Sequence, residues 1–286
     1  MVTPFVNDEV DLEGLRTNLR KLRTTGVTGY LALGSNGEFR SLSEKETGQI
    51  TGTFAEEKGD KVLIVGAGCE STAVTIANCR RAAELGADYA SLITPSYFPK
   101  FMTEEVMQRY FSSVADASPI PVMIYNIPGS TGGVQISPRV VAQLSLHPNI
   151  AGMKDSSPSG PAAFLAAVPE KSDFSVLSGS TNTFYPSLCI GAAGGVLSLA
   201  NIIPEACVRL YQLFLNGEHA EAKKLHVALL KLNQAVSGKY GVAGVKAAMN
   251  AAGFRAGSPR LPLAALTEEE TAGLARTFAE AGFPLV

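Results

Sequence analysis

The chain has 286 residues, of which 46% are hydrophobic and 17% charged, enough to bury about three quarters of its unfolded surface without disulfides or a structural metal. Its formal charge is -2, from 24 basic and 26 acidic residues in no long block, which argues against nucleic acid or a membrane surface as partner. No apolar run reaches the roughly 18 residues of a transmembrane helix. We expect a cytoplasmic protein, and a mitochondrial location stays open if the N-terminus is incomplete.

Short apolar runs rich in β-branched residues recur along the chain, each followed by a Gly-, Ser-, Pro- or Asn-marked turn and a helical pattern. The expected strands are 30–33, 62–65, 89–93, 121–125, 150–154, 174–177 and 195–198. Apolar strands that alternate with helices are typical of a parallel sheet covered on its outer side. This repeat predicts a (β/α)8 TIM barrel, provided that 2–5 supplies the first strand. Because that segment begins at Met1, its strand is unusually short or the true start lies upstream.

Capping signals mark several helix boundaries. Three helix starts carry them: Ser43 with Glu46, Ser137 before Pro138, and Thr267 with Glu270. Gly86 ends a helix and turns the chain into the next strand. After Asn201 the strand signals stop, and amphipathic helical patterns run to the C-terminus. We therefore expect a barrel domain over 1–203 and a C-terminal helical extension over 204–286.

Two side chains at the ends of neighbouring predicted strands are candidates for chemistry, because barrel active sites lie at the carboxyl ends of the strands. Lys154 ends the run 150–154, where partial burial favours the neutral amine that attacks a carbonyl. Tyr125 ends the preceding strand, and strands lie about 4.8 Å apart, so phenol and amine should converge. Position alone leaves plainer interpretations open: a lysine reaching into solvent at the rim, and a tyrosine with a satisfied hydroxyl.

The segment 34–38, with sequence GSNGE, follows a strand and precedes a capped helix. Its backbone N–H groups can form a nest for a carboxylate, and Ser35 can pass a proton between Tyr125 and the reacting centre. A tight turn that needs two glycines explains these residues equally well. The spacing matches neither a P-loop nor a dinucleotide-binding fingerprint.

Metal chemistry is disfavoured by the histidines and cysteines. His219 and His226 look like surface residues of one helix, and His147 lies in a loop before a proline. The four cysteines have no CxxC spacing. We expect neither a metal nor an organic cofactor.

Four segments, LALGSNGEF, SLITPSYFP, PVMIYNIPGSTG and NIAGMKDSS, together resemble the dihydrodipicolinate synthase and N-acetylneuraminate lyase family of class I aldolases, over essentially the whole chain. The resemblance implies that Lys154 forms a Schiff base with a 2-oxo acid and that Tyr125 is the general acid and base. It implies that Ser35 relays protons, and that the loop amides at Ser35 and Asn36 bind the substrate carboxylate.

The same resemblance implies a homo-oligomer, a tetramer built as a dimer of tight dimers. Tyr97 then completes the proton relay from the adjacent subunit. Gly195 and Val196 fall where the family places backbone groups near the substrate.

Departures from the family pattern bear on the substrate. Dihydrodipicolinate synthases usually carry an arginine after the YN-x-P segment to hold the aldehyde's carboxylate; here Ser130 occupies that position of the substrate site. The segments GSNGEF, 66–72 and 147–156 instead look like 4-hydroxy-2-oxoglutarate aldolase, which releases pyruvate and glyoxylate. In that reaction Ser156 and Asn36 would help orient the second half of the substrate.

Three alternatives remain open. One is a 2-keto-3-deoxy sugar acid aldolase, and another is a dihydrodipicolinate synthase that condenses pyruvate with aspartate semialdehyde. The third is a catalytically silent barrel that senses a keto acid.

Overall fold

The computed structural model describes residues 1–285 of the chain. A seven-stranded sheet has the order β3-β4-β5-β6-β7-β8-β9, so each strand lies beside the next one in sequence. The strands are β3 (Gly29–Ala32), β4 (Val62–Gly66), β5 (Tyr89–Ile93), β6 (Val122–Asn126), β7 (Ile150–Asp155), β8 (Ser175–Ser178) and β9 (Gly194–Gly195). The pairings from β4 to β9 are parallel, as the sequence predicts.

A helix precedes β3, one helix follows each strand from β3 to β9, and three further helices come last in the described residues. They are α1 (Leu12–Arg23), α2 (Glu44–Glu57), α3 (Thr72–Glu84), α4 (Glu104–Ala117), α5 (Pro138–Leu144), α6 (Ala162–Ala167), α7 (Thr181–Cys189), α8 (Pro204–Leu215), α9 (His219–Asn233), α10 (Lys239–Ala251) and α11 (Glu268–Glu280). The three expected caps, at Ser43, Ser137 and Thr267, are confirmed. Among the described residues, no helix is both long enough and apolar enough to cross a bilayer.

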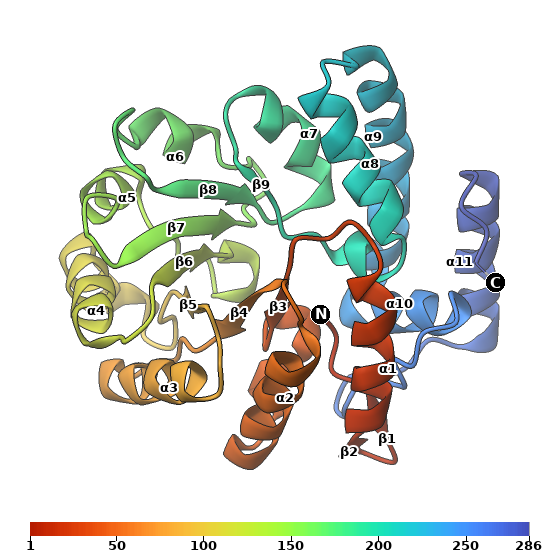
Figure 1. Ribbon diagram of the computed structural model, residues 1–286, viewed down its shortest axis with the longest axis horizontal. Helices are drawn as coiled ribbons and strands as arrows, with labels where there is room; N and C mark the ends of the chain where they lie inside the picture. Colours follow the sequence, from red (N-terminus) through yellow and green to blue (C-terminus); the bar gives the residue numbers. More distant parts are fainter. Residues whose placement is uncertain (286) are drawn as a thin grey trace. The chain divides into compact units, whose positions relative to one another are not determined.

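The chain forms two compact units: unit 1 is Met1–Leu63 with Leu197–Val286, and unit 2 is Ile64–Val196. In unit 2, α3 to α6 follow one another along the outer side of β5 to β8 (Figure 1). The core cluster of this unit includes the buried side chains of Leu92, Phe111 and Ile124. Burying each such side chain contributes about 1.5–3 kcal/mol, so the strands that end at the predicted reactive residues have a well-packed support.

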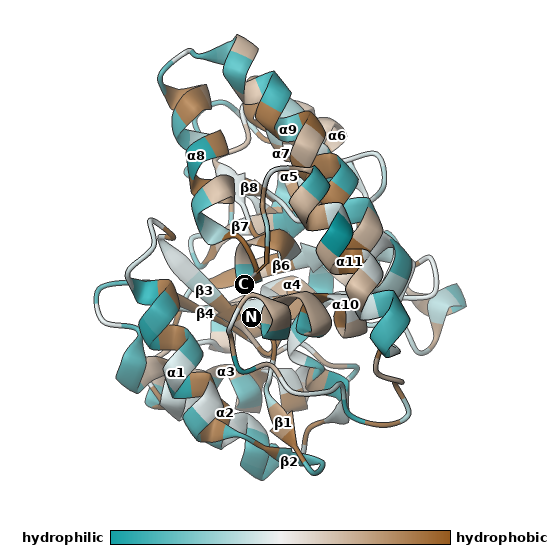
Figure 2. Ribbon diagram, turned by 90° about the vertical axis from the view of Figure 1, so that its right-hand side faces the viewer, coloured by the Kyte–Doolittle hydropathy of each residue, from teal (hydrophilic) through white to brown (hydrophobic). Residues whose placement is uncertain are grey.

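Unit 1 contains the four C-terminal helices together with α1 and α2. Hydrophilic and hydrophobic bands alternate around α8 and α9 (Figure 2), which is the pattern of helices that bury one face. His226 on α9 is buried, so its expected surface position is wrong. Burial lowers the pKa of this imidazole, because the charged form loses hydration.

The expected opening strand over 2–5 is also wrong. Instead Phe5–Val6 (β1) pairs antiparallel with Glu9–Val10 (β2) in a separate two-stranded sheet. The two turn residues between them, Asn7 and Asp8, both have positive φ, which suits a tight hairpin turn. The preceding residues lie beside β3 without forming a strand, through a 2.7 Å hydrogen bond from the Met1 ammonium to the Leu31 carbonyl.

The last expected strand, 195–198, is shorter than predicted. Only the two glycines of β9 pair with β8, and a 3-10 turn, η5 (Ser198–Asn201), follows. The strand pairing ends there because the chain turns into η5.

Candidate active site

Tyr125 and Lys154 lie at the carboxyl ends of β6 and β7. They are direct register partners, so their side chains leave neighbouring strands on the same face of the sheet. The Lys154 Nζ atom lies 4.3 Å from the centroid of the Tyr125 ring. Tyr125 is buried and Lys154 is partly exposed. The Lys154 amine and the Tyr125 ring therefore lie side by side at the ends of these strands.

A buried polar network fixes the strand ends that carry this pair. Asp155 and Asn126, the next residues on the two strands, are fully buried. The Asp155 carboxylate accepts hydrogen bonds from Asn126 Nδ2 at 2.7 Å and from Ser157 Oγ at 2.7 Å. A buried carboxylate is costly unless it is hydrogen-bonded, so this network favours one arrangement of the two strands. Sequence reasoning missed these residues, although their place beside Tyr125 and Lys154 was a signal.

Gly179 leaves space next to Lys154. A Cβ atom at Gly179 would lie 2.0 Å from Ser156 Oγ and 3.0 Å from Lys154 Cε. The Ser156 hydroxyl and the lysine stem therefore border the same small volume, which only glycine leaves open. Sequence reasoning placed Ser156 near the substrate but missed Gly179.

Three other predicted site residues of unit 2 differ in their hydrogen bonds and exposure. The Val196 backbone N–H donates a hydrogen bond to the Ser178 carbonyl of β8 at 2.8 Å, so this amide already has a partner within the sheet. Gly195, the register partner of Ser178 at the end of β9, is exposed. Ser130 is exposed at the end of the 3-10 turn η4 (Pro128–Ser130), which follows β6.

Tyr97 lies on an exposed loop of unit 2. Its side chain is 75% exposed, and the nearby Phe98 and Phe101 are 60% and 69% exposed. The Glu70 carboxylate accepts backbone hydrogen bonds from Ser96 at 2.9 Å and Tyr97 at 3.0 Å. A carboxylate therefore anchors the loop that presents this aromatic group, and sequence reasoning missed it.

Ser35 and Asn36 belong to unit 1. They form the 3-10 turn η1 (Ser35–Gly37) directly after β3. Asn36 Nδ2 donates to Ser198 Oγ at 2.8 Å, which ties the turn to η5. Glu38, the residue that closes the turn, has a buried carboxylate that faces Lys246 at 2.6 Å. The expected glycine-rich turn is present, and its partners come from more than 150 residues later in the chain.

Parallel strands that alternate with helices, and a lysine amine beside a phenol at the strand ends, define a lyase of the class I aldolase type. The model of the dihydrodipicolinate synthetase family matches residues 1–281. The chain belongs to this family.

Relatives and solved structures agree with this assignment. The chain is 36% identical to a 4-hydroxy-tetrahydrodipicolinate synthase of Methanothrix thermoacetophila, over 96% of this chain and 92% of the relative. It is 34% identical to "Probable 4-hydroxy-2-oxoglutarate aldolase, mitochondrial" of Emericella nidulans, over 96% and 90%. The crystal structure of dihydrodipicolinate synthase from Acinetobacter baumannii complexed with pyruvate is similar with a TM-score of 0.91 and 30% identity, over 99% of this chain and 97% of that one. The predicted (β/α)8 fold class is thereby confirmed.

Proposed function

We propose that this lyase cleaves 4-hydroxy-2-oxoglutarate to pyruvate and glyoxylate through a Schiff base on Lys154. The observation that carries the proposal is the Lys154 amine 4.3 Å from the centroid of the Tyr125 ring. A neutral amine attacks a ketone, and a phenol beside it can move the protons that each later step requires.

The proposed reaction begins when Lys154 Nζ adds to the C2 carbonyl of the substrate. Loss of one water gives a protonated imine. Tyr125 becomes a phenolate when it gives its proton to the departing hydroxyl; it then accepts the proton of the C4 hydroxyl while the C3–C4 bond breaks, and the bonding electron pair moves into the imine to give an enamine. Glyoxylate leaves; protonation at C3 and addition of one water release pyruvate and the free amine. Side chains, substrate and water account for every step, so the proposal includes no metal or organic cofactor.

Ser35 and Asn36 are proposed to bind the carboxylate of the 2-oxo acid, with Ser35 also relaying protons to Tyr125. Support comes from the place of the turn η1 directly after β3 and from the Asn36 side chain, which donates a hydrogen bond to Ser198 and so fixes the turn. All candidate substrates contain this carboxylate, because each is a 2-oxo acid.

Ser156, Gly195, Val196 and Ser130 are proposed to line the space for the aldehyde half of the substrate. Support is strongest for Ser156, whose hydroxyl borders the same volume as the Lys154 stem. Val196 can contribute only through groups other than its N–H, which the sheet uses.

Tyr97 is proposed to act in the active site of a second copy, within a tetramer of tight dimers. Its support is the group of three exposed aromatic side chains, Tyr97, Phe98 and Phe101, because neighbouring exposed apolar side chains are typical of an interface. Glu70 holds the loop in place for such a contact.

Borohydride reduction in the presence of pyruvate tests the central step. We expect one pyruvyl adduct per chain, located at Lys154 by peptide mass analysis, and none in Lys154→Ala. An unmodified protein, or an adduct on a different lysine, would refute the assignment of the nucleophile.

A dihydrodipicolinate synthase is the second candidate, because similar solved structures carry that name. Ser130 argues against it, since a hydroxyl cannot form the bidentate contact that an arginine makes with a carboxylate. Pyruvate release from 4-hydroxy-2-oxoglutarate and from 2-keto-3-deoxy sugar acids, measured beside condensation of pyruvate with aspartate semialdehyde, separates the candidates. Faster condensation than cleavage would favour the synthase.

A further inference from the structure

Unit 1 contains a buried ion pair outside the proposed catalytic groups. Lys246 Nζ on α10 lies 2.6 Å from Glu38 Oε1, and both side chains are 1% exposed. Glu38 directly follows the turn η1, which holds Ser35 and Asn36. Each charge of so deeply buried an ion pair depends on the other, because removal of either partner leaves a buried charge without compensation.

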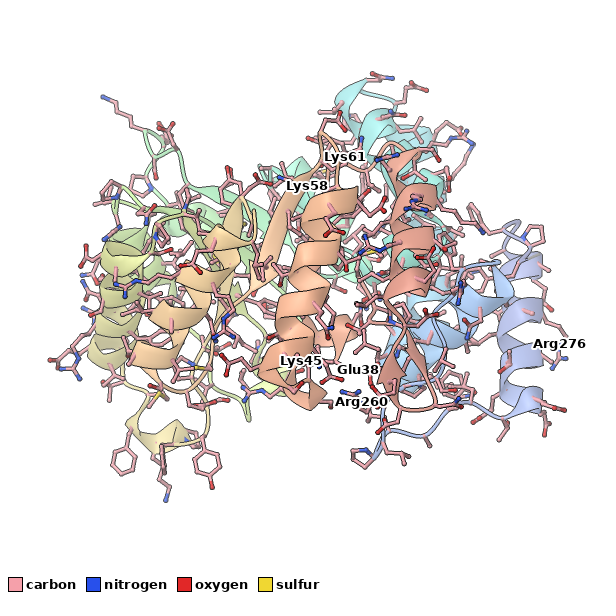
Figure 3. The ribbon with its side chains drawn as sticks, turned by 60° about the horizontal axis from the view of Figure 1, so that its bottom comes forward. Glu38, Lys45, Lys58, Lys61, Arg260 and Arg276 are labelled. Atoms are coloured by element: carbon pink, nitrogen blue, oxygen red, sulfur yellow. The ribbon has the colours of Figure 1, made fainter. Side chains whose placement is uncertain are left out.

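Further groups surround both charges. The backbone N–H of Arg260 donates to Glu38 Oε2 at 2.8 Å, and Lys246 Nζ donates to the Ser258 carbonyl at 2.9 Å. Figure 3 shows Glu38 and Arg260 close together, with Arg276 of α11 farther away. Two cations contact the Phe5 ring, whose centroid lies 4.2 Å from Lys246 Nζ and 4.4 Å from Arg260 Cζ. The C-terminal segment thus supplies a partner to each oxygen of the Glu38 carboxylate.

The backbone of Glu38 is itself unusual. Its φ of 53° and ψ of 36° lie in the left-handed region, which residues other than glycine, asparagine and aspartate seldom adopt. Its N–H donates to the Ser35 carbonyl, and its own carbonyl accepts from Ser41, so it joins η1 to the next 3-10 turn, η2 (Phe39–Ser41). Such a conformation persists where surrounding contacts hold it, and the buried carboxylate supplies those contacts.

We propose that Glu38 and Lys246 are positioning residues, which hold the turn Ser35–Gly37 in the conformation that binds the carboxylate of the 2-oxo acid substrate. This inference rests on the proposed function, because it takes that turn as the carboxylate site. It assigns α10 of the C-terminal helices a part in substrate binding, although neither side chain touches the substrate.

The test compares Glu38→Gln, Lys246→Met and the double variant Glu38→Gln/Lys246→Met with the wild-type protein. The double variant removes both charges at once, so it avoids the unpaired buried charge that can prevent folding of either single variant. Glu57→Gln is the matched control: Glu57 pairs with Arg20 at 2.7 Å between α2 and α1 of the same unit. The first readout is the pyruvate concentration that gives half-maximal borohydride trapping on Lys154.

We expect half-saturation to rise about tenfold to a hundredfold in the double variant, as for other small displacements of positioning groups, while maximal trapping stays complete. Glu57→Gln should trap pyruvate like the wild type. A folded double variant with wild-type half-saturation would overturn the positioning role.

Amide hydrogen exchange of the peptide that covers 34–42 is the second readout, and it requires no substrate. The proposal expects faster exchange of this peptide in the double variant and not in Glu57→Gln; equal exchange overturns it. If the wild-type protein forms no pyruvate adduct, the proposed function fails, and the exchange experiment still decides whether the ion pair holds the turn.

Discussion

Lys154 contacts the ring of Tyr125, with its Nζ atom 4.3 Å from the ring centroid, because the two residues are register partners on adjacent parallel strands. The contact involves the aromatic face, so an ammonium there gains cation–π stabilisation that does not depend on the hydroxyl. A variant that keeps the Tyr125 ring and removes its hydroxyl therefore separates the packing of the ring against Lys154 from proton transfer by the hydroxyl.

Tyr125→Phe should lower kcat by about 10²- to 10⁴-fold, the usual contribution of a positioned general acid and base. Pyruvate should still be trapped on Lys154 by borohydride, because the ring that flanks the amine remains. Steady-state kinetics and intact-protein mass measure the two effects. A variant that keeps the wild-type kcat would show that the phenol moves no proton in the rate-limiting step.

Gly179→Ala should reduce both activity and stability. The new methyl group would lie 2.0 Å from Ser156 Oγ and 2.8 Å from the Asp155 carbonyl, so the strand end beside Lys154 must shift. We expect a loss of about 1–3 kcal/mol in the free energy of unfolding, as for other overpacked sites. We also expect kcat to fall by about tenfold or more because Lys154 moves.

Gly48→Ala is the matched control, since a Cβ at this position of α2 would meet nothing within 4 Å. It should stabilise the protein by about 0.5–1 kcal/mol and leave kcat unchanged. Urea unfolding and steady-state assays of both variants check the pair. Equal activity of Gly179→Ala and the wild type would show that this space is not needed.

Local patterns predicted most of what positions the site. The strand over 89–93 and the caps at Ser43 and Thr267 match the structure, because each depends on residues that are close in sequence. The meeting of Tyr125 and Lys154 was also predictable, since a parallel sheet of consecutive strands aligns their carboxyl ends.

Long-range polar contacts were not predictable in this way. Nothing in the sequence near Glu38 indicates that its partner is Lys246, because the pairing depends on how α10 packs in unit 1. The burial of His226 has the same origin. The hairpin of β1 and β2 did have a local signal, because Asn7 and Asp8 are residue types that tolerate the positive φ of a two-residue turn.

Glu46 should make the stability of unit 1 sensitive to acid. Its hydrogen bond from the Arg260 side chain is the main reason that its pKa falls from 4.5 to about 2. The folded pKa lies below the unfolded value, so the stabilisation is complete above about pH 4.5 and is lost as pH falls toward about 2. Glu46→Gln should cost about 1–3 kcal/mol near neutral pH, and this difference should shrink across that window.

Glu270→Gln is the control for this prediction. Glu270 forms the same kind of capping box with Thr267 and has no arginine partner in the part of the chain that the structure describes. Its substitution should cost less, because only the cap changes. Urea midpoints for both variants between about pH 7 and pH 2.5 test the assignment. A Glu46→Gln difference that stays constant over this range would contradict it.

Mixing inactive variants tests whether Tyr97 acts across a subunit interface. A dimer of Tyr97→Phe and Lys154→Ala chains has one site with both an intact lysine and an intact partner tyrosine. Random exchange of equal amounts should therefore restore about a quarter of the wild-type activity in a symmetric dimer.

Tyr125→Phe mixed with Lys154→Ala is the control, because Tyr125 and Lys154 meet within one chain and no exchange can rebuild that pair. Recovery in the first mixture alone supports the proposal; absence of recovery, with subunit exchange demonstrated by native mass spectrometry, places Tyr97 outside the neighbouring site.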